Sequence, residues 1–374
     1  MKNKIIFLVN VDSFFVSHRL PIAKQLLLDG YDVHIATQFT RYKKKLLKMG
    51  FNTHDINFNE NSVNLLKAIL PIFQIFFLIR KIKPTIIHLI SLKPIIFGGF
   101  VTLISPINSM VISITGLGSM FLKKGIFYKI RENTFNLFYR IIFLFPNLKV
   151  ILQNRSDLNY LINKAKIKKK KTEIIRGSGV DLKSLKFSKI PKKEPTIVMA
   201  SRIIADKGIF EYIKSIQYLK KNNFKGKFYL VGDIDYKNPS AIKKSTINYW
   251  HKKKIITYVK HQKKISTFLK KSTIVVLPSY REGFPKILME AAACGRPVVT
   301  TNVPGCKDAI IKNITGVLVP PKNHILLAKA IKNLCDNRKK LESIGKAARK
   351  HALKNFDINN VVSQHLYIYK SLQD

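Results

Sequence analysis

Acidic residues are scarce in this 374-residue chain. It carries 21 Asp and Glu against 67 Lys and Arg, which gives a formal net charge of +46 at pH 7. Such a charge has three interpretations: lysines that are merely solvated, contact with an anionic membrane or anionic substrates, and nucleic-acid binding. Charge alone does not separate them, although it favours the capture of phosphorylated ligands.

Cysteine is scarce as well. The chain has three cysteines, Cys294, Cys306 and Cys335, and none of them forms a CxxC pair or a Cys/His cluster with zinc spacing. This argues against a disulfide framework and fits a reducing cytoplasm.

A long unbroken apolar run is also missing. The first one, in MKNKIIFLVNVD, ends at Asn10 and Asp12, too early for a signal peptide, and no small-residue cleavage site follows. The segment from Pro94 to Leu122 is uncharged over 29 residues but contains Gly98-Gly99 and other breakers. It predicts a helix, a turn, a strand and a loop of a soluble core instead of a membrane span.

What the chain does contain is a repeated alternation of short strands and helices. Hydrophobic residues make up 46% of it, and its length suggests two domains. Runs such as KIIFLV and TIIHLIS alternate with helical patterns in the first half, and TIVMAS, KFYLVGD and TIVVLPS do so in the second. This pattern indicates parallel sheets covered on both faces, with ligands at the carboxyl ends of the strands. A Gly- and Pro-containing stretch near residues 180–195 separates a domain 1–185 from a domain 186–374.

Two of the scarce acids lie in one segment, YREGFPKILMEAAACGRPVV. Pro285 suits a first helical position and Gly295 the position after the last turn, so Glu282 precedes a helix and Glu290 lies within it. A helix N-terminus can bind a phosphate, and carboxylates near it can accept hydrogen bonds from sugar hydroxyls. The alternative is that Glu282 only complements the helix dipole and Glu290 is a surface residue.

A second segment, ASRIIADKGIFEYI, supplies positive charge. Arg202 follows a predicted strand and Lys207 precedes a predicted helix. Arg binds diphosphate with a forked geometry and Lys adds a point charge. Both residues are ordinary among 67 basic ones, but their position at a strand's carboxyl end favours ligand binding.

The segments SRIIADKG, EGFPKILMEAAACGRPVV and GVLVP resemble the donor domain of retaining glycosyltransferases of family 4. Glu282 and Glu290 match the Glu-x7-Glu element, that family's most specific signature. FVSHRLPIAKQL, ITGLGSMF, QNRSDLNYL and GSGVDL resemble bacterial transferases that extend undecaprenyl-diphosphate-linked sugars, N-acetylgalactosaminyltransferases above all. The similarity extends over nearly the whole chain.

The resemblance implies the α/β GT-B fold, two doubly wound Rossmann-like domains that face each other across a cleft. Residues 1–185 would bind the acceptor and residues 186–374 the nucleotide sugar, with a C-terminal helix packing back toward the N-terminal domain. The reaction would move a sugar, for instance N-acetylgalactosamine, from a UDP-sugar to a polyprenyl-diphosphate-linked or surface-polysaccharide acceptor, with retention and without metal or cofactor.

Residue roles follow from the same resemblance. Arg202 and Lys207 would neutralise the diphosphate, and Glu290 would hold the ribose. Glu282, the catalytic candidate, and the segment Gly283-Phe284-Pro285 would contact the donor sugar and its phosphate.

In the other domain, Gly116 and Gly118 would let the backbone approach the donor. His18 and Arg19, which we expect at the start of the first helix, would contact the acceptor. His88 matches a common strand-end position.

The chain departs from the family at two places. The loop TGLG lacks the histidine that many relatives carry there, and Lys260 stands where relatives usually have glycine, which leaves the base pocket open. The sequence GDID, with Asp233 and Asp235, resembles the Asp-x-Asp manganese motif of the other large glycosyltransferase fold. It has no supporting His or acid nearby, so we interpret it as a loop without metal.

Two stretches, LLKAILPIFQIFFLIRKIK and FLKKGIFYKIRENTFNLFYRIIFLFP, alternate aromatic residues with Lys and Arg. They suit interfacial helices on anionic lipid, and so predict a cytoplasmic enzyme held on the inner face of the membrane. Ordinary core helices with solvated lysines are the alternative.

Two other functions stay open. A nucleic-acid-binding protein would explain the charge, but the basic residues are spread along the chain and no known binding motif is present, so we expect no nucleic acid. A GT-B epimerase acting on UDP-N-acetylglucosamine is the second, although EGFPKILME favours transfer.

Overall fold

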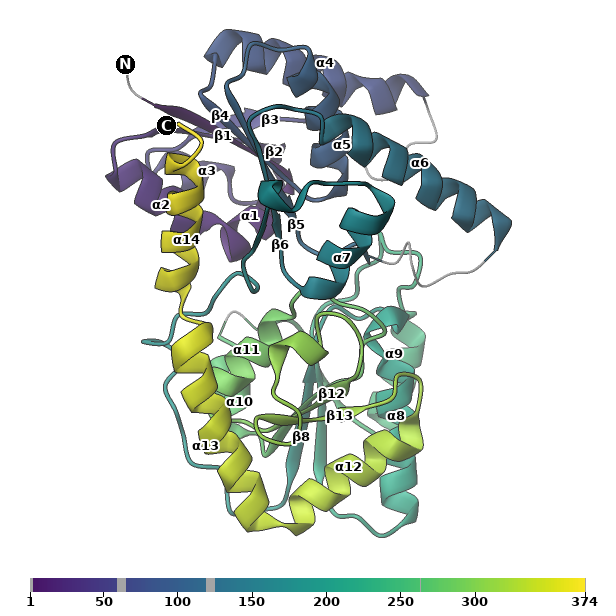
Figure 1. Ribbon diagram of the computed structural model, residues 1–374. Coiled ribbons are helices and arrows are strands. Elements are labelled where there is room, and N and C mark those ends of the chain that lie inside the picture. The colour runs from purple at the N-terminus through teal and green to yellow at the C-terminus, as the bar shows by residue number, and fades with distance from the viewer. Residues whose placement is uncertain (1–2, 59–64, 119–124, 263, 374) are drawn as a thin grey trace. The chain divides into compact units, whose positions relative to one another are not determined.

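The computed structural model describes residues 3–58, 65–118, 125–262 and 264–373. They divide into two compact units, one made of Met1–Ser178 with Asn359–Asp374 and the other of Gly179–Ile358 (Figure 1). This division falls a few residues before the boundary that we predicted between 185 and 186. The end of the chain lies in the first unit instead of the second.

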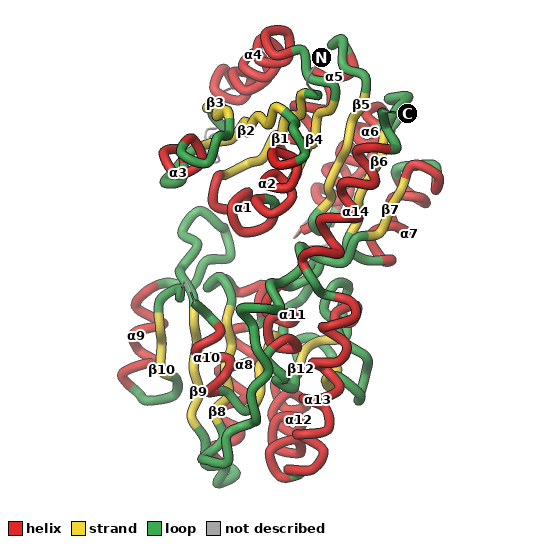
Figure 2. Tube along the Cα trace, turned by 90° about the vertical axis from the view of Figure 1, so that its left-hand side faces the viewer, coloured by secondary structure: helices red, strands yellow, loops and turns green. Residues whose placement is uncertain are grey.

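The first unit contains a seven-stranded parallel sheet with helices on both faces (Figure 2). Its strand order is β3-β2-β1-β4-β5-β6-β7. The strands are β1 (Lys4–Val11), β2 (Asp32–Gln38), β3 (Asn52–Asp55), β4 (Ile86–Ile90), β5 (Ser109–Ile114), β6 (Leu148–Leu152) and β7 (Thr172–Ile174). The helices are α1 (Asp12–His18), α2 (Leu20–Leu28), α3 (Lys43–Leu47), α4 (Leu65–Ile82), α5 (Leu92–Leu103), α6 (Ile126–Ile142), α7 (Arg155–Lys164) and, at the chain's end, α14 (Ile358–Lys370).

Alternate residues of β1 enter two separate cores, because successive side chains of a strand point to opposite faces. Ile6 and Leu8 join the core under α4, α5 and α6, whereas Ile5, Phe7 and Val9 join the core under α1, α2 and α14. Burial on both faces is the reason that such strands are apolar throughout.

The final helix completes this second core. Val361, Ile368 and Tyr369 of α14 are buried with residues of α1 and α2, and Figure 1 shows α14 beside α2. The predicted packing of the C-terminal helix on the N-terminal domain is therefore confirmed.

The second unit repeats the plan with a six-stranded parallel sheet of order β10-β9-β8-β11-β12-β13. The strands are β8 (Thr196–Ala200), β9 (Lys227–Val231), β10 (Thr257–Val259), β11 (Ile274–Leu277), β12 (Val298–Thr301) and β13 (Gly316–Val319). The helices are α8 (Ile209–Lys221), α9 (Lys244–Lys252), α10 (Ser266–Lys271), α11 (Lys286–Ala293), α12 (His324–Asp336) and α13 (Arg338–Asn355). The order reverses between β8 and β11, and such a reversal is where open parallel sheets bind ligands.

The uncharged segment from Pro94 resolves as expected into α5, a turn and β5, and its end, residues 119–122, lies outside the described residues. Within the described ranges, no helix has the length and apolar character needed to cross a membrane.

Candidate functional site

The predicted donor-site residues meet where the strand order of the second sheet reverses. Arg202 follows β8, and Lys207 ends a short 3-10 turn before α8. The segment from Ser279 to Pro285 joins β11 to α11. Two neighbouring strands thus deliver both predicted charge sets to one edge of the sheet.

Two glycines let these loops approach each other. Gly208 has a φ of +75°, and a Cβ there would overlap the carbonyl oxygen of Pro278 at the end of β11. Gly305 has a φ of +80°, and a Cβ there would overlap the backbone of Glu282. Any larger residue would therefore push the Glu282 loop out of place.

Glu282 lies at the centre of the site. Its Oε1 accepts hydrogen bonds from Lys207 Nζ at 2.5 Å and from Ser279 Oγ at 2.7 Å. The side chains of Lys207 and Glu282 are 15% and 11% exposed, so this ion pair is largely shielded from water. The pairing of Lys207 with Glu282 was not predicted, although both residues were.

Arg202 pairs with a different acid. Its Nη1 donates to Asp235 Oδ2 at 2.7 Å, and its side chain is 61% exposed. The neighbouring Asp233 Oδ1 accepts from the backbone N–H of His261 at 3.1 Å. The two aspartates of GDID therefore connect the loops that follow β8, β9 and β10. The described residues contain no cluster of three or more His, Cys, Asp or Glu that could hold a metal ion.

The turn before α11 contributes backbone more than side chains. Phe284 is 6% exposed and packs edge-to-face on Phe356, with ring centroids 5.7 Å apart. Pro285 is the N-cap of α11 and has no N–H, so of Gly283, Phe284 and Pro285 only the first two can donate an amide. The expected first helical position of Pro285 was wrong by one residue.

Glu290 lies within α11, as predicted, and is partly buried. Burial raises the pKa of its carboxyl group to about 7, and Lys286 opposes this rise. Glu290 can therefore both donate and accept a hydrogen bond near neutral pH, which suits a diol ligand.

The predicted acceptor-side residues lie in the first unit. His18 ends α1 and Arg19 stands between α1 and α2, so their expected place at the start of the first helix was wrong. The cause is the short helix α1, which the sequence pattern did not reveal. His18 stacks on Phe14, with ring centroids 4.2 Å apart, and Arg19 is 2% exposed.

Gly116 and Gly118 follow β5 with φ values of +125° and +69°, conformations that favour glycine. His88 lies inside β4 and is fully buried. Its Nδ1 is 2.7 Å from Tyr369 Oη, and its Nε2 is 2.7 Å from Ser113 Oγ. His88 thus connects α14 to the sheet.

Sequence reasoning missed two supporting residues, Ser279 and Asp235. Ser279 stands three positions before Glu282 and two after the end of β11, a place from which its hydroxyl can reach Glu282 within the loop. Asp235 was noticed only as part of a rejected metal motif, although it follows a strand adjacent to that of Arg202.

Comparison with known proteins identifies the class of enzyme. Residues 181–351 match a family model described as glycosyl transferases group 1, and residues 4–144 match one described as glycosyl transferase 4-like. The protein is a GT-B glycosyltransferase. The matches cover both halves and favour the enzymatic interpretation of the chain over nucleic-acid binding.

Among the relatives of this transferase is the N,N'-diacetylbacillosaminyl-diphospho-undecaprenol alpha-1,3-N-acetylgalactosaminyltransferase of Campylobacter jejuni. It is 27% identical over 98% of each chain. The capsular polysaccharide biosynthesis glycosyltransferase CapM of Staphylococcus aureus is 29% identical over 46% of this chain and 44% of its own. A crystal structure of Anabaena Alr3699/HepE in complex with UDP shares the fold, with a TM-score of 0.79, 17% identity and coverage of 99% of this chain and 100% of that one.

Proposed function

We propose that this glycosyltransferase moves an N-acetylhexosamine, N-acetylgalactosamine first among them, from its UDP-linked form to a sugar on a polyprenyl diphosphate, with retention at the anomeric carbon. The reaction needs no metal ion in this proposal. The observation that carries it is the group formed by Lys207, Glu282 and Ser279 beside the Arg202–Asp235 pair at the reversal of the second sheet.

The charges of this site suit a diphosphate leaving group. When UDP-sugar binds, its diphosphate takes Arg202 and Lys207 as counterions, and the N-terminal turn of α11 adds its dipole. Glu282 is then released from Lys207 to accept hydrogen bonds from the sugar hydroxyls. Glu290, further along α11, binds the ribose diol.

Retention follows from reaction on one face of the sugar. The bond from the anomeric carbon to the phosphate oxygen breaks, and the bond to the acceptor oxygen forms on the same face. The acceptor's hydroxyl proton goes to the leaving phosphate oxygen. This path asks the protein mainly for positive charge around the departing oxygens, which Lys207 and Arg202 provide.

We choose the proposed donor and acceptor by analogy with the relatives. The name of the Campylobacter enzyme specifies an N-acetylgalactosamine and an undecaprenol-diphosphate acceptor, and that enzyme aligns with this chain almost end to end. The HepE complex contains UDP. Both support the choice of UDP-N-acetylhexosamine as the first donor to test.

A donor panel tests this function. The full chain is incubated with UDP-GalNAc, UDP-GlcNAc, UDP-galactose and UDP-glucose, with and without a polyprenyl-diphosphate-linked N-acetylhexosamine, and released UDP is measured. We expect acceptor-dependent release at least about tenfold faster from an N-acetylhexosamine donor than from the simple hexoses. NMR of the product should show the donor's anomeric configuration.

The opposite results are equally clear. An inverted linkage would overturn retention, and a preference for a simple hexose would overturn the donor. Conversion of UDP-GlcNAc to its epimer without acceptor would establish the epimerase instead.

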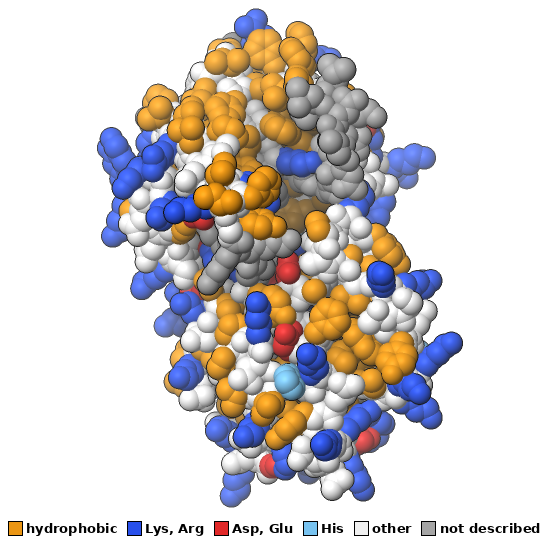
Figure 3. Space-filling view, turned by 90° about the vertical axis from the view of Figure 1, so that its right-hand side faces the viewer, with side chains coloured by type: hydrophobic (Ala, Val, Ile, Leu, Met, Phe, Trp, Pro, Cys, Tyr) orange, Lys and Arg blue, Asp and Glu red, His pale blue; other side chains and the backbone are white. Residues whose placement is uncertain are grey.

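The second part of the proposal concerns the membrane. Helices α4 and α6 of the first unit expose large apolar side chains to water, a face we call the α4–α6 surface. Its residues are Ile69, Leu70, Phe73 and Phe77 of α4 and Ile126, Phe127, Ile130 and Leu137 of α6. Figure 3 shows hydrophobic side chains gathered on the upper part of the first unit, with Lys and Arg around them.

An apolar face ringed by basic residues suits the surface of an anionic bilayer. Phe77 and Ile126 are 64% and 79% exposed, which is costly in water unless another surface covers them. A lipid-linked acceptor would be reached from the same surface. Flotation with liposomes tests this: we expect co-flotation with vesicles that contain phosphatidylglycerol, and equal flotation with neutral vesicles would contradict it.

A further inference from the structure

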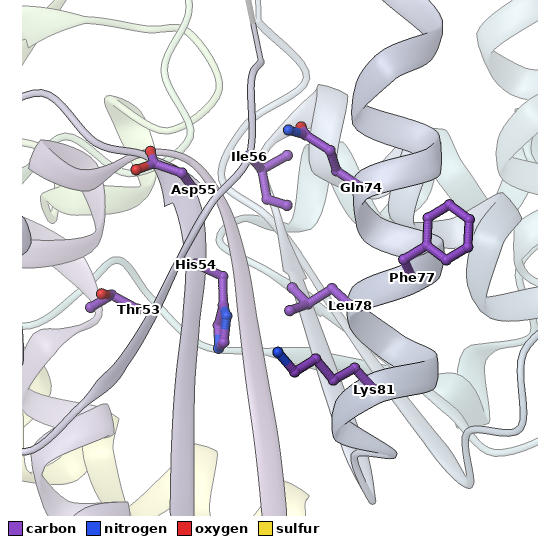
Figure 4. Close-up of a pocket in the computed structure, with 8 residues that line it drawn as sticks. All are labelled: Thr53, His54, Asp55, Ile56, Gln74, Phe77, Leu78 and Lys81. Atoms are coloured by element: carbon purple, nitrogen blue, oxygen red, sulfur yellow. The ribbon is translucent and has the colours of Figure 1, made fainter.

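A pocket of about 410 Å³ lies between β3, the edge strand of the first sheet, and α4 (Figure 4). It is a shallow hollow that is open to solvent and not an enclosed cavity. We call it the β3–α4 pocket. Its lining residues are Thr53, His54, Asp55, Ile56, Gln74, Phe77, Leu78 and Lys81.

The pocket has two polar sides. Figure 4 shows Lys81 and His54 extending toward each other from α4 and β3. His54 Nε2 lies 3.0 Å from His34 Nδ1, and His34 Nε2 lies 3.1 Å from Asp32 Oδ2. The Nε2 edge of the His54 imidazole therefore faces His34.

The charge of the pocket is positive on balance. Asp55 is its single lining acid, and Lys43 Nζ neutralises it at 2.8 Å. Lys81 is exposed and, in the part of the chain that the structure describes, forms no ion pair. Burial, with smaller contributions from the neighbouring His34, Lys81 and Lys43, lowers the pKa of His54 to about 4, so this ring is neutral near pH 7.

The pocket is continuous with the α4–α6 surface. Phe73, Phe77 and Lys81 are spaced by four residues along α4 and therefore share one side of the helix. Phe77 belongs both to the exposed face and to the pocket lining. Lys81 thus stands where the apolar stripe ends, as a lysine does when its stem lies on apolar surface and its ammonium reaches the polar layer.

We propose that the β3–α4 pocket binds the headgroup of an anionic phospholipid, with Lys81 on the phosphate, His54 and Gln74 on the polar headgroup, and Phe77 and Leu78 against the glycerol end of the chains. This inference rests on the membrane docking proposed above and adds a discrete lipid site to it. A soluble phosphate would leave the apolar wall without a partner, so the combination of charge and apolar surface favours a lipid.

NMR tests the site directly. Dihexanoyl phosphatidylglycerol, below its critical micelle concentration, is titrated into the full chain while the His54 ring signal, assigned with His54→Gln, is followed. We expect a saturable shift of this signal that Lys81→Gln weakens by about tenfold or more in apparent Kd. The matched control Lys83→Gln removes the same charge from an exposed lysine outside the pocket and should leave the titration unchanged.

Two arms identify the ligand. Dihexanoyl phosphatidylcholine should shift the signal much less, and sn-glycerol 3-phosphate should not shift it. An equal response to glycerol phosphate would assign the pocket to a soluble phosphate and overturn the lipid proposal. If Lys81→Gln and Lys83→Gln lowered the apparent lipid affinity equally, the binding would be non-specific charge attraction and the proposed site would be wrong.

Vesicles separate this inference from the function on which it rests. In partitioning onto vesicles that contain phosphatidylglycerol, Lys83→Gln should weaken binding by at most about fivefold, as one surface charge does, and Lys81→Gln by about tenfold or more. Vesicle binding by the wild type with equal effects of the two variants would remove the lipid site and keep membrane docking. Absence of vesicle binding would remove both, while donor turnover would still report on the transferase.

Discussion

Two sets of charged and polar residues, one in each unit, differ in how far they are exposed to water. In the second unit, the Lys207–Glu282 and Arg202–Asp235 pairs stand in loops at the carboxyl ends of the strands, with side chains 11% to 61% exposed. In the first unit, Arg19, His88, His365 and Tyr369 are at most 2% exposed. One set lies where a ligand can compete for it, and the other set is enclosed.

This difference in exposure suggests two roles for polar residues, ligand binding in one set and structural hydrogen bonding in the other. Paired charges at a loop edge already have partners without ligand, and under the proposed function they exchange them when a diphosphate binds. Buried imidazoles cannot change charge easily, since burial lowers the pKa of His88 well below its usual value and that of His365 to about 3. His88 joins α14 to the sheet through Tyr369 and Ser113. The Nδ1 atom of His365 lies 2.7 Å from the Val361 carbonyl oxygen, a contact within α14.

The largest loss of activity should come from replacing Glu282, the central residue of the paired charges in the second unit. Glu282→Ala removes the acceptor for Lys207 and Ser279 and the proposed contact to the donor sugar, so we expect kcat/KM to fall by about 10²–10³-fold. Release of UDP from the preferred donor measures it. Glu342→Ala, which removes an exposed acid paired with Arg338 on α13, is the matched control and should retain full turnover. Near-wild-type activity in Glu282→Ala would contradict the assignment.

Replacing a buried polar residue of the first unit should lower the stability of the protein instead of its activity. His88→Leu leaves the hydroxyls of Tyr369 and Ser113 buried without this partner, so the free energy of unfolding should fall by about 2–4 kcal/mol. Urea denaturation measures the loss, and faster proteolysis of α14 would locate it. His251→Leu changes an exposed histidine and should stay within about 0.5 kcal/mol of the wild type.

The affinity for UDP distinguishes a ligand-binding role of His88 from a structural one. It should be unchanged in His88→Leu. If UDP affinity fell while stability did not, His88 would belong to the ligand-binding set and the contrast between the units would be lost.

The smallest effect concerns Glu290, which lies between the two classes. Its pKa is raised from 4.5 to about 7 in the folded protein, so the folded state binds more protons than the unfolded state between these values. Its contribution to stability is thus full below pH 4.5 and is lost as the pH rises through 7. Glu290→Gln should be more stable than the wild type by about 1–3 kcal/mol at pH 8.5 and equal to it near pH 4.5.

Urea denaturation at both pH values checks this expectation. If the difference in unfolding free energy did not depend on pH, burial would not raise the pKa of the Glu290 carboxyl group. Nucleotide affinity in the wild type should rise across pH 7 if the ionised form holds the ribose.

Much of the fold could be predicted from the sequence because both sheets are parallel and buried on both faces, which makes each strand a short apolar run between helices. Glu282 and Glu290 were selected as candidates because two acids around a Gly-Phe-Pro turn are conspicuous in a basic chain. Arg202 and Lys207 were selected as candidates from their places relative to a strand and a helix.

The ion-pair partners of the candidate residues were harder to predict than their positions relative to strands and helices. The bond from Lys207 to Glu282 joins residues 75 positions apart, and that from Arg202 to Asp235 joins residues 33 apart. Neither spacing has a local signature, because loops after different strands meet only when the sheet forms. The enclosure of Arg19 was missed for the same reason, since it depends on a core that includes residues from the far end of the chain.

That last core has a consequence for how the protein is made. The second unit, Gly179–Ile358, is inserted between two parts of the first unit, and Val361, Ile368 and Tyr369 come from the part that follows it. During synthesis, the ribosome must produce the whole second unit before the first can close its core. The second unit can therefore fold first, although it begins later, while one face of the first sheet waits for α14.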